Sequence, residues 1–323
     1  MPQYYDFLIL MILIITAYPA VIFLYSIYKR PNSWEAKHKK ITLALSIILL
    51  FGTSIIIWGS FIEPKLIVIN KQEIDLKNIN TPLKIVFISD LHVGPYKKTE
   101  WVEKVVNKII KQKPDLVLIG GDNLYNSEYK LEEMDYLKPL AKLAKMFPTY
   151  SINGNHEYGI GDGRNSKKHP IFNANWSREI KIAMEKLNIK YLQNDLELIE
   201  IKNQKFYLFG SDCILAGKLD FLNLQEREEN IATISLIHNP LFLFTTDYPK
   251  MDLTLSGHTH GGQVRLPFLG PIGKVDNLLP SNFYQGLHDL SNGNKIFVTS
   301  GIGESGPRAR LFNPPEIALI TIE

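Results

Sequence analysis

Two histidines near the end of an apolar stretch have the spacing of a metal site. His258 and His260 stand two residues apart in the segment 255–263, LSGHTHGGQ, directly after the apolar run 251–255. In an extended strand, residues i and i+2 point to the same face, so the two imidazoles converge on one spot. Glycines on both sides lower the steric cost of bringing backbone close to a bound group. Because one such pair is more often surface or satisfied core than a metal site, further ligands must come from elsewhere in the chain.

Residues of ligand type also follow four other apolar runs. They are Asp90 and His92, Asp122 and Asn123, Asn155 with His156 and Glu157, and His238 with Asn239. In open α/β sheets ligands bind at the carboxyl ends of strands, so these loops are expected to meet at one crevice. Taken singly, each residue has an ordinary structural explanation: Asp122 as a cap, Asn155 in a left-handed turn, His238 as a hydrogen-bonded core imidazole. Their joint occurrence at strand ends favours a metal centre.

The elements that would position these residues alternate between strands and helices. The sequence predicts strands over 84–89, 115–119 and 149–152, a helix over 99–111 that begins at a Thr99 cap, and a helix over 129–146. The second half adds a helix over 179–187 and several strands. These strands are 190–192, a hairpin over 196–209 that turns at Asn203-Gln204, 234–237, 253–255, 295–299 after an Asn292-Gly293 turn, and 317–322. This inventory fits an α/β fold, a four-layer α-β-β-α sandwich of two mixed β-sheets flanked by helices.

The first 64 residues have the composition of a membrane hairpin. Residues 7–28 and 41–62 are uncharged apolar runs of 22 residues, each about 33 Å long as a helix and therefore able to span a bilayer. A cleaved signal peptide is the alternative for the first run, but residues 1–6 carry no basic group and the run exceeds the roughly 7–15 apolar residues of such peptides. We therefore expect two transmembrane helices within 1–64, a connector over 65–82 that includes a short strand over 66–70, and a catalytic domain over 83–323.

The distribution of charge bears on membrane side and on partners. The loop 29–40 carries five Lys or Arg residues and the segment before the first run carries none, which favours a cytoplasmic loop and an extracytoplasmic catalytic domain. Lysines at 65, 71, 77 and 84 weaken this bias. Past residue 64, 31 of the 36 basic and 30 of the 33 acidic residues remain, so no nucleic-acid partner is expected. Cys213 is the only cysteine, which excludes an intramolecular disulfide and a thiolate metal cluster.

The ordered blocks D-x-H at 90–92, G-D at 121–122, G-N-H-E at 154–157, His238 and G-H-x-H at 257–260 make residues 83–323 resemble the calcineurin-like metallophosphoesterases. Segments 261–264 and 301–317 are similar to the membrane-anchored bacterial branch, in which a membrane segment commonly precedes the catalytic domain. The resemblance implies a dinuclear-metal hydrolase of phosphodiesters or pyrophosphates.

The resemblance also implies a role for each matching residue. One metal ion would take Asp90, His92, Asp122 and His260, and the other would take Asp122, Asn155, His238 and His258, with Asp122 bridging both. Two cations roughly 3.5–4 Å apart can clamp the oxygens of an anionic phosphodiester during in-line attack. His156 would stay outside the metals, where it would protonate the leaving oxygen or stabilise the charge of the transition state. Mixed carboxylate and imidazole ligands suit transition metals better than Mg or Ca, with manganese taken first and iron or zinc as alternatives.

The expected substrate is amphiphilic. About 20 residues separate the second apolar run from the first catalytic strand and span at most roughly 70 Å, so the active site stays near the bilayer. The bacterial branch suggests UDP-2,3-diacylglucosamine, whose pyrophosphate would be cleaved to lipid X and UMP during lipid A synthesis. That nucleotide is cytoplasmic, whereas a teichoic-acid or phospholipid headgroup fits an external domain. A non-catalytic membrane scaffold would be expected to have lost ligands, and a transporter would need intramembrane charges that the two runs lack.

Two further features have two explanations each. The loop 158–175, rich in Gly, Asn and Lys, is either a lid beside His156 or solvated surface. Arg308 and Arg310 either hold a substrate phosphate or pair with Glu304 or Glu316. Asn123 follows the bridging aspartate where some relatives carry another residue type. The sequence contains no signal for the oligomeric state.

Overall fold

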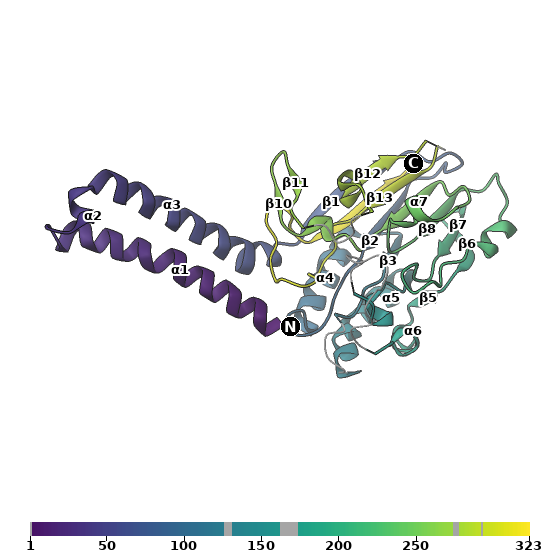
Figure 1. Ribbon diagram of the computed structural model, residues 1–323. Helices are drawn as coiled ribbons and strands as arrows, with labels where there is room; N and C mark the ends of the chain where they lie inside the picture. The colour runs from purple at the N-terminus through teal and green to yellow at the C-terminus, as the bar shows by residue number, and fades with distance from the viewer. Residues whose placement is uncertain (1, 126–130, 162–173, 274–277, 292) are drawn as a thin grey trace.

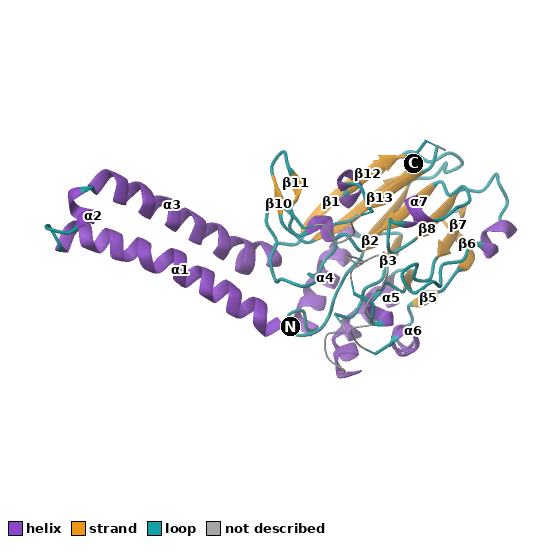
Figure 2. Ribbon diagram, viewed as in Figure 1, coloured by secondary structure: helices purple, strands orange, loops and turns teal. Residues whose placement is uncertain are grey.

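The structure, a computed structural model, describes residues 2–125, 131–161, 174–273, 278–291 and 293–323. A long helical hairpin projects from an α/β domain, and the start of the chain lies at the end of the hairpin that meets this domain (Figure 1). The N-terminal part is helical apart from a short turn at residues 30–33, whereas the strands gather in the domain (Figure 2). The fold therefore has the expected division into an apolar helical part and an α/β part.

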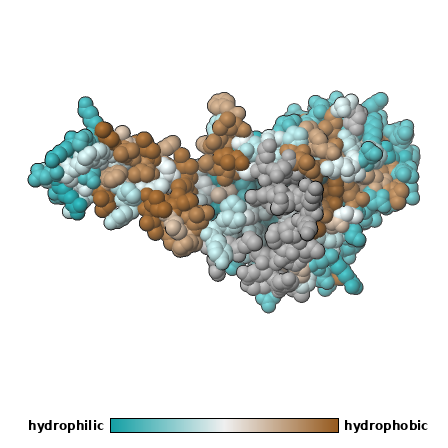
Figure 3. All heavy atoms as spheres, in the orientation of Figure 1, coloured by the Kyte–Doolittle hydropathy of each residue, from teal (hydrophilic) through white to brown (hydrophobic). Residues whose placement is uncertain are grey.

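The helical hairpin matches the two apolar runs. α1 (Pro2–Lys29) and α3 (Lys39–Ile57) run against each other, a short α2 (Trp34–Lys37) lies between them, and a π-helical turn, η1 (Trp58–Ile62), continues α3. Both long helices are long and apolar enough to cross a membrane. Large apolar side chains cover the outside of the pair (Figure 3). The helices meet through small and hydroxylated residues, and Thr53 Oγ1 donates a hydrogen bond of 2.9 Å to Thr16 Oγ1 across the pair.

The connection into the domain is itself structured. A 3-10 turn, η2 (Glu63–Lys65), ends the hairpin, and β1 (Val68–Ile74) follows. The strand expected over 66–70 thus begins two residues later and is longer. β1 pairs in parallel with the last strand of the chain, from Val68 opposite Glu316 to Ile74 opposite Ile322. Residues 68–74 of the expected connector are therefore part of the sheet.

Two six-stranded mixed sheets pack face to face. The first has the order β1-β14-β2-β3-β4-β5 and the second the order β12-β13-β9-β8-β7-β6. The first sheet contains β2 (Leu83–Ile88), β3 (Leu116–Ile119), β4 (Thr149–Ile152), β5 (Lys190–Leu192) and β14 (Glu316–Ile322). The second contains β6 (Asp195–Ile201), β7 (Gln204–Gly210), β8 (Thr233–Leu236), β9 (Leu253–Ser256), β12 (Gly286–Asp289) and β13 (Lys295–Val298). β14 runs antiparallel to β2, whereas β2, β3, β4 and β5 are parallel.

The core explains why these strands are apolar throughout. Phe87 and Leu118 from the first sheet and Leu208, Leu255 and Phe297 from the second belong to one buried cluster between the sheets. The outer face of the first sheet packs against α4 (Thr99–Gln112), α5 (Ala141–Met146) and α6 (Ser177–Lys186). The outer face of the second sheet is covered by shorter elements, α7 (Phe242–Thr245) and η5 (Leu222–Glu226). The expected sandwich is confirmed, with one thin helical layer.

Several local expectations were wrong in detail. The helix expected over 129–146 is a 3-10 stretch, η3 (Leu131–Leu140), followed by α5, because Pro139 lacks the N–H that a continuous α-helix requires; residues 129–130 lie outside the described part. The β6–β7 turn is at Lys202-Asn203, whose φ values of 54° and 62° suit a hairpin turn, rather than at Asn203-Gln204. The cap position of α4 is Lys98, and Thr99 is its first helical residue.

Strand β12 was not expected at all, because Gly286–Asp289 has neither apolar alternation nor length. It pairs with β13 and extends the second sheet at its edge. The Asn292-Gly293 turn expected before β13 includes residue 292, which lies outside the described residues.

Candidate metal centre

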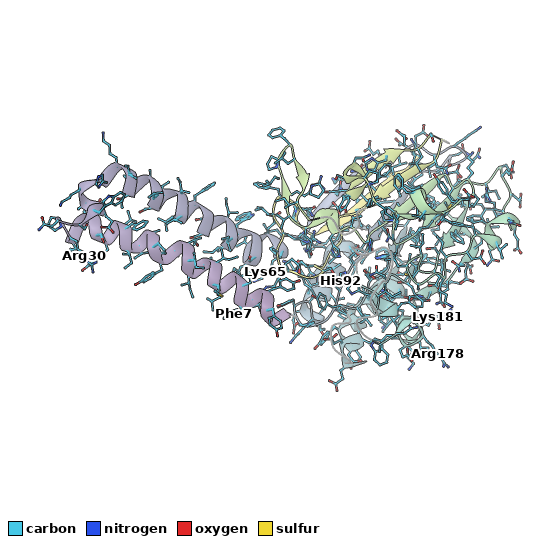
Figure 4. All side chains as sticks on the ribbon, viewed as in Figure 1. Phe7, Arg30, Lys65, His92, Arg178 and Lys181 are labelled. Carbon is cyan, nitrogen blue, oxygen red and sulfur yellow. The ribbon has the colours of Figure 1, made fainter. Side chains whose placement is uncertain are left out.

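The ligand-type residues of five loops converge at one edge of the two sheets. Each loop follows a strand: β2, β3 and β4 in the first sheet and β8 and β9 in the second. The side chains are those of Asp90, His92, Asp122, Asn155, His156, His238, His258 and His260, all buried except His156, which is half-buried. Figure 4 shows His92 on the side of the domain that meets the helical hairpin.

The backbone of this site is unusual. Five of the residues have a left-handed conformation that non-glycine residues rarely adopt. They are Asp90 (φ 57°), His92 (44°), Asp122 (50°), His258 (67°) and His260 (50°). Close packing adds a steric requirement, since a Cβ atom on Gly154 would lie 2.1 Å from Asp122 Oδ1. Each such backbone position costs of order 1–3 kcal/mol and persists only where the surrounding structure enforces it, as at functional sites.

Asp90, His92 and His260 form the first ligand group. His92 Nε2 and His260 Nε2 are 3.1 Å apart, and Asp90 Oδ1 lies 3.6 Å from His260 Nε2 and 3.9 Å from His92 Nε2. Donor atoms bound to one ion at about 2.0–2.1 Å are separated by roughly 3–3.4 Å. The other ring nitrogen of His260 lies 3.3 Å from the carbonyl oxygen of Gly303, which orients the ring as is usual for metal-bound histidine. This group therefore fits one cation.

Asp122, His238 and His258 form the second group, together with Asn155. His238 Nε2 is 3.2 Å from Asp122 Oδ2, and His238 Nδ1 is 2.7 Å from the carbonyl oxygen of Gly120. The Asn155 amide donates to the carbonyl oxygen of Ile160 at 2.6 Å, so its Oδ1 faces His258 Nδ1 at 2.9 Å. A carbonyl oxygen only accepts, so His238 Nδ1 carries a proton and leaves Nε2 as the potential ligand.

Asp122 links the two groups. Its Oδ2 also lies 3.6 Å from His92 Nε2, so one carboxylate reaches donor atoms of both. Burial raises the pKa of Asp122, but the nearby His238 and His156 lower it by more, and the net pKa lies well below the usual range. Burial raises the pKa of Asp90 to about 6. Burial lowers the pKa of His238, but the charge and hydrogen bond of Asp122, together with the charge of Asp90, raise it by more, to about 10. Buried carboxylates and imidazoles arranged in this way would bind divalent cations, and binding would displace the protons that these groups carry.

His156 occupies a different position from the other histidines. Its backbone N–H donates to Asp122 Oδ1 at 2.8 Å, and its Nδ1 lies 2.8 Å from the carbonyl oxygen of Tyr125. Because a carbonyl oxygen only accepts, it fixes the proton of the neutral ring on Nδ1. The imidazole also lies within 4.8 Å of donor atoms of His92 and Asp122. The described geometry thus brings His156 beside the ligands, with its ring held through Nδ1 by the carbonyl oxygen of Tyr125.

Glu157 is a positioning residue to which the sequence analysis gave no role. Its buried carboxylate accepts hydrogen bonds from the backbone N–H groups of Asp122 at 3.2 Å, Asn123 at 2.6 Å and Gly154 at 2.7 Å. It therefore ties the loop after β3 to the loop after β4. Burial, followed by the charge of Asp122, raises the pKa of Glu157. Its place two residues after Asn155 was the only signal in the sequence.

The two arginines of the C-terminal segment have structural contacts. Arg310 is fully buried and donates to the carbonyl oxygens of Asn313 at 3.0 Å and Ser300 at 2.9 Å, with Glu304 Oε1 3.7 Å from its Nε. Arg308 pairs with Asp6 of α1 at 3.0 Å. Arg310 thus lies beside Glu304, as the structural alternative expects, whereas the partner of Arg308 is Asp6 rather than Glu304 or Glu316. Most of the expected lid, 162–173, lies outside the described residues.

Comparisons with known proteins agree with the geometry. The family model of the calcineurin-like phosphoesterases matches residues 83–262, which include all of the ligand-type residues above. The chain is 30% identical to phosphodiesterase YaeI of Escherichia coli over 76% of this chain and 84% of that protein. It is 28% identical to the uncharacterized metallophosphoesterase Cj0846 of Campylobacter jejuni over 87% of this chain and 72% of that protein.

Among solved structures, purple acid phosphatase PPD1 from yellow lupin aligns with 72% of this chain and 47% of its own, at 14% identity and a TM-score of 0.41. The match of the family model and the identity to YaeI establish the assignment. The chain belongs to the calcineurin-like phosphoesterases and is a metal-dependent phosphoesterase.

Proposed function

We propose that this protein is a membrane-anchored dinuclear-metal phosphohydrolase that cleaves a phosphodiester or pyrophosphate bond of a lipid or another amphiphilic cell-envelope substrate. One observation carries the proposal. Asn313 joins the end of the second apolar helix to the metal centre, because its backbone N–H donates to Glu63 Oε1 at 2.5 Å and its amide donates to the carbonyl oxygen of His260 at 2.6 Å. A metal-ligand residue is thus two hydrogen bonds from the helical hairpin.

Further contacts fix the hairpin against the domain. Lys97 Nζ donates to the carbonyl oxygen of Pro64 at 2.9 Å and lies 3.2 Å from Glu304 Oε1. The backbone N–H of Arg310 donates to the carbonyl oxygen of Gly59 at 2.8 Å. Because these groups are buried, solvent cannot easily replace the bonds. If the hairpin spans a bilayer, the metal centre is held close to its surface.

A pocket at this junction suits an anionic amphiphile. It has a volume of about 350 Å³ and lies between the end of the helical hairpin and the start of α4. Its lining includes Lys65, Lys98, Lys104 and Arg308 with the aromatic ring of Trp101. Cationic groups attract phosphate oxygens, and aromatic rings are favoured where apolar and polar surroundings meet.

The residues of the site divide the chemistry between them. When bound, the two cations supply the positive charge that lets an anionic phosphodiester be attacked by water. Asp122, held by the His156 N–H and by the Glu157 contacts to its loop, brings the two ligand groups together. His156, with Nδ1 fixed by Tyr125, delivers a proton from Nε2 to the leaving oxygen. The ligand chemistry suits manganese, with iron or zinc as alternatives.

The charge of the loop 29–40 supports a cytoplasmic loop and an extracytoplasmic catalytic domain. Reporter fusions at Lys37 and at Glu323 test this orientation. If a reporter that works only in the cytoplasm is active when fused at Glu323, the orientation is the reverse. That result would favour UDP-2,3-diacylglucosamine, which is cytoplasmic, over a teichoic-acid or phospholipid headgroup as the substrate.

The substrate class is tested with one phosphodiester in acylated and deacylated forms, assayed in mixed micelles with the full-length protein. Hydrolysis of the acylated form should be faster by about 10-fold or more, because the amphiphile is concentrated at the surface that holds the enzyme. Equal rates for both forms would reject the lipid substrate and leave the phosphoesterase activity intact.

A further inference from the structure

We propose that the β-hairpin formed by β10 (Arg265–Leu266) and β11 (Gly270–Pro271) is a third membrane contact, whose apolar tip inserts into the interface of the bilayer that the helical hairpin spans. We call residues 267–269, between the two strands, the hairpin tip. The inference rests on the membrane anchoring in the proposed function and adds a site of lipid contact within the catalytic domain.

The hairpin tip exposes large apolar side chains. Phe268 is fully exposed and Leu269 is 79% exposed, and Ile272, directly after β11, is 60% exposed. Phe268 and Gly270 both have positive φ values, 67° and 79°, so the turn has a defined shape that holds these side chains out. Contiguous exposed apolar side chains on a protruding turn mark a binding surface, whereas scattered ones do not.

The position of the hairpin tip identifies the partner as the bilayer. The backbone N–H of Arg265 donates to the carbonyl oxygen of Leu311 at 2.9 Å, and the N–H of the preceding Arg310 donates to the carbonyl oxygen of Gly59 at 2.8 Å. Gly59 lies in η1, at the domain end of the second apolar helix. The β-hairpin stands out from the domain beside the end of α3 (Figure 1). In Figure 3 it forms an apolar projection next to the apolar surface of the helices.

The base of the β-hairpin packs on the metal-ligand segment. Arg265 Nη1 donates to the carbonyl oxygen of Gly261 at 2.8 Å, directly after His260. The N–H of Ile272 donates to the carbonyl oxygen of Val264 at 2.9 Å. A Cβ atom on Gly262 would lie 2.3 Å from Pro271, so the two segments are in close contact. Seating the tip in the bilayer would therefore fix how the metal centre faces the membrane surface.

The test uses single cysteines in the full-length protein, labelled with an environment-sensitive fluorophore and reconstituted in vesicles that contain lipids with a nitroxide near the headgroup. Phe268→Cys and, separately, Leu269→Cys report on the tip. Leu222→Cys is the matched control, since Leu222 is an exposed apolar residue, 64% exposed, in η5 beside β6. Ile14→Cys on the outside of α1 is the membrane reference. The native Cys213 is buried, and burial raises the pKa of its thiol, so it should resist labelling.

We expect about twofold or greater quenching at both tip positions and no change at Leu222→Cys, because an interfacial segment lies within roughly 5–10 Å of the headgroups. Tip signals equal to that of Leu222→Cys, with Ile14→Cys quenched by lipids that carry a deeper nitroxide, would overturn the inference while leaving membrane anchoring intact. If Ile14→Cys is not quenched by either lipid, the anchoring itself fails and the inference fails with it.

Discussion

The helical hairpin and the α/β domain bury opposite kinds of side chain. In the hairpin, large apolar residues such as Ile14 and Phe51 point outward, and hydroxylated residues such as Thr42 and Ser46 are buried. In the domain, aliphatic and aromatic residues fill the space between the sheets. Exposed apolar side chains around a contact of small and hydroxylated residues are the pattern of a helix pair that could span a membrane, whereas the domain buries its apolar side chains away from water.

The contact region between the helical hairpin and the domain, which we call the seam, follows neither pattern because it buries charged side chains. Glu63, Lys97, Glu304 and Arg310 are buried there, and their contacts reach the segment that holds His260. Buried charges are costly unless they are paired and hydrogen-bonded. The seam therefore has a specific geometry, which the variants below test from the domain side, from the hairpin side and from the seam itself.

The largest effect is expected on the domain side. Asp122→Asn should abolish activity, with a loss of at least about 10³-fold, and remove most of the metal, because one carboxylate serves both ligand groups. Elemental analysis of the purified protein measures the metal. Asp247→Asn, on the exposed surface, is the control and should bind metal normally. Membrane extraction of Asp122→Asn should match that of the wild type, since the hairpin is untouched. Full metal occupancy in Asp122→Asn would refute the bridging role.

His156→Ala should lower turnover by about 10²–10⁴-fold, the usual range for a lost acid or base. The metals should stay bound, because the variant loses none of the seven proposed ligands. The loss should be larger on an alkyl ester than on a nitrophenyl ester, whose leaving group needs no proton. His288→Ala, in β12, is the control. An equal loss on both esters would argue against proton donation by His156.

Glu157→Gln should weaken metal binding by about 10–100-fold, the range for residues that orient metal ligands. The amide replaces one accepting oxygen by an N–H₂ group that faces the backbone N–H groups now held by Glu157. Calorimetric titration with Mn²⁺ measures the change. Glu185→Gln, an exposed substitution, should bind as the wild type does, and an unchanged affinity in Glu157→Gln would remove its positioning role.

A smaller effect is expected at the seam. Glu63→Ala removes the acceptor for the N–H of Asn313 and the partner of the Trp58 indole, 2.8 Å away. Metal affinity should fall by about 3–10-fold, less than for a residue that contacts the ligand loops directly. Glu73→Ala, in exposed β1 surface, serves as the comparison. If Glu63→Ala binds metal as tightly as the wild type, the helical hairpin does not position the metal centre.

The smallest effect concerns pH. Burial lowers the pKa of Lys97 to about 8 although Glu304 opposes the shift. Between about pH 8 and 10 the unfolded chain, with an ordinary lysine pKa near 10.4, binds more protons than the folded one, so the contribution of Lys97 to stability rises with pH. The unfolding free energy of the wild type relative to Lys97→Met should therefore increase by about 1–3 kcal/mol across this window. Lys98→Met, on the exposed neighbour, should show no such increase.

The strand ends could be predicted because buried strands appear in the sequence as short continuous apolar runs. Ligands bind at the carboxyl ends of such strands. Asp90, Asp122 and His260 were placed correctly at one edge for this reason. Glu157 was not recognised as a positioning residue, because it acts on backbone N–H groups that no sequence pattern reveals. β12 was missed because sheet pairing, not alternation, makes Gly286–Asp289 a strand. The membrane-facing role proposed for Phe268 depends on backbone hydrogen bonds that link the β-hairpin to Gly59 through residues 310–311, a connection between segments far apart in the sequence.

The two ligand groups joined by Asp122 predict a two-metal centre in this domain. Mn²⁺ titration of the metal-free full-length protein, with activity followed on a soluble phosphodiester, tests it most directly. We predict that activity rises until two ions are bound per chain, because Asp122 joins two complete ligand groups. Full activity with one ion bound per chain would contradict the two-metal centre.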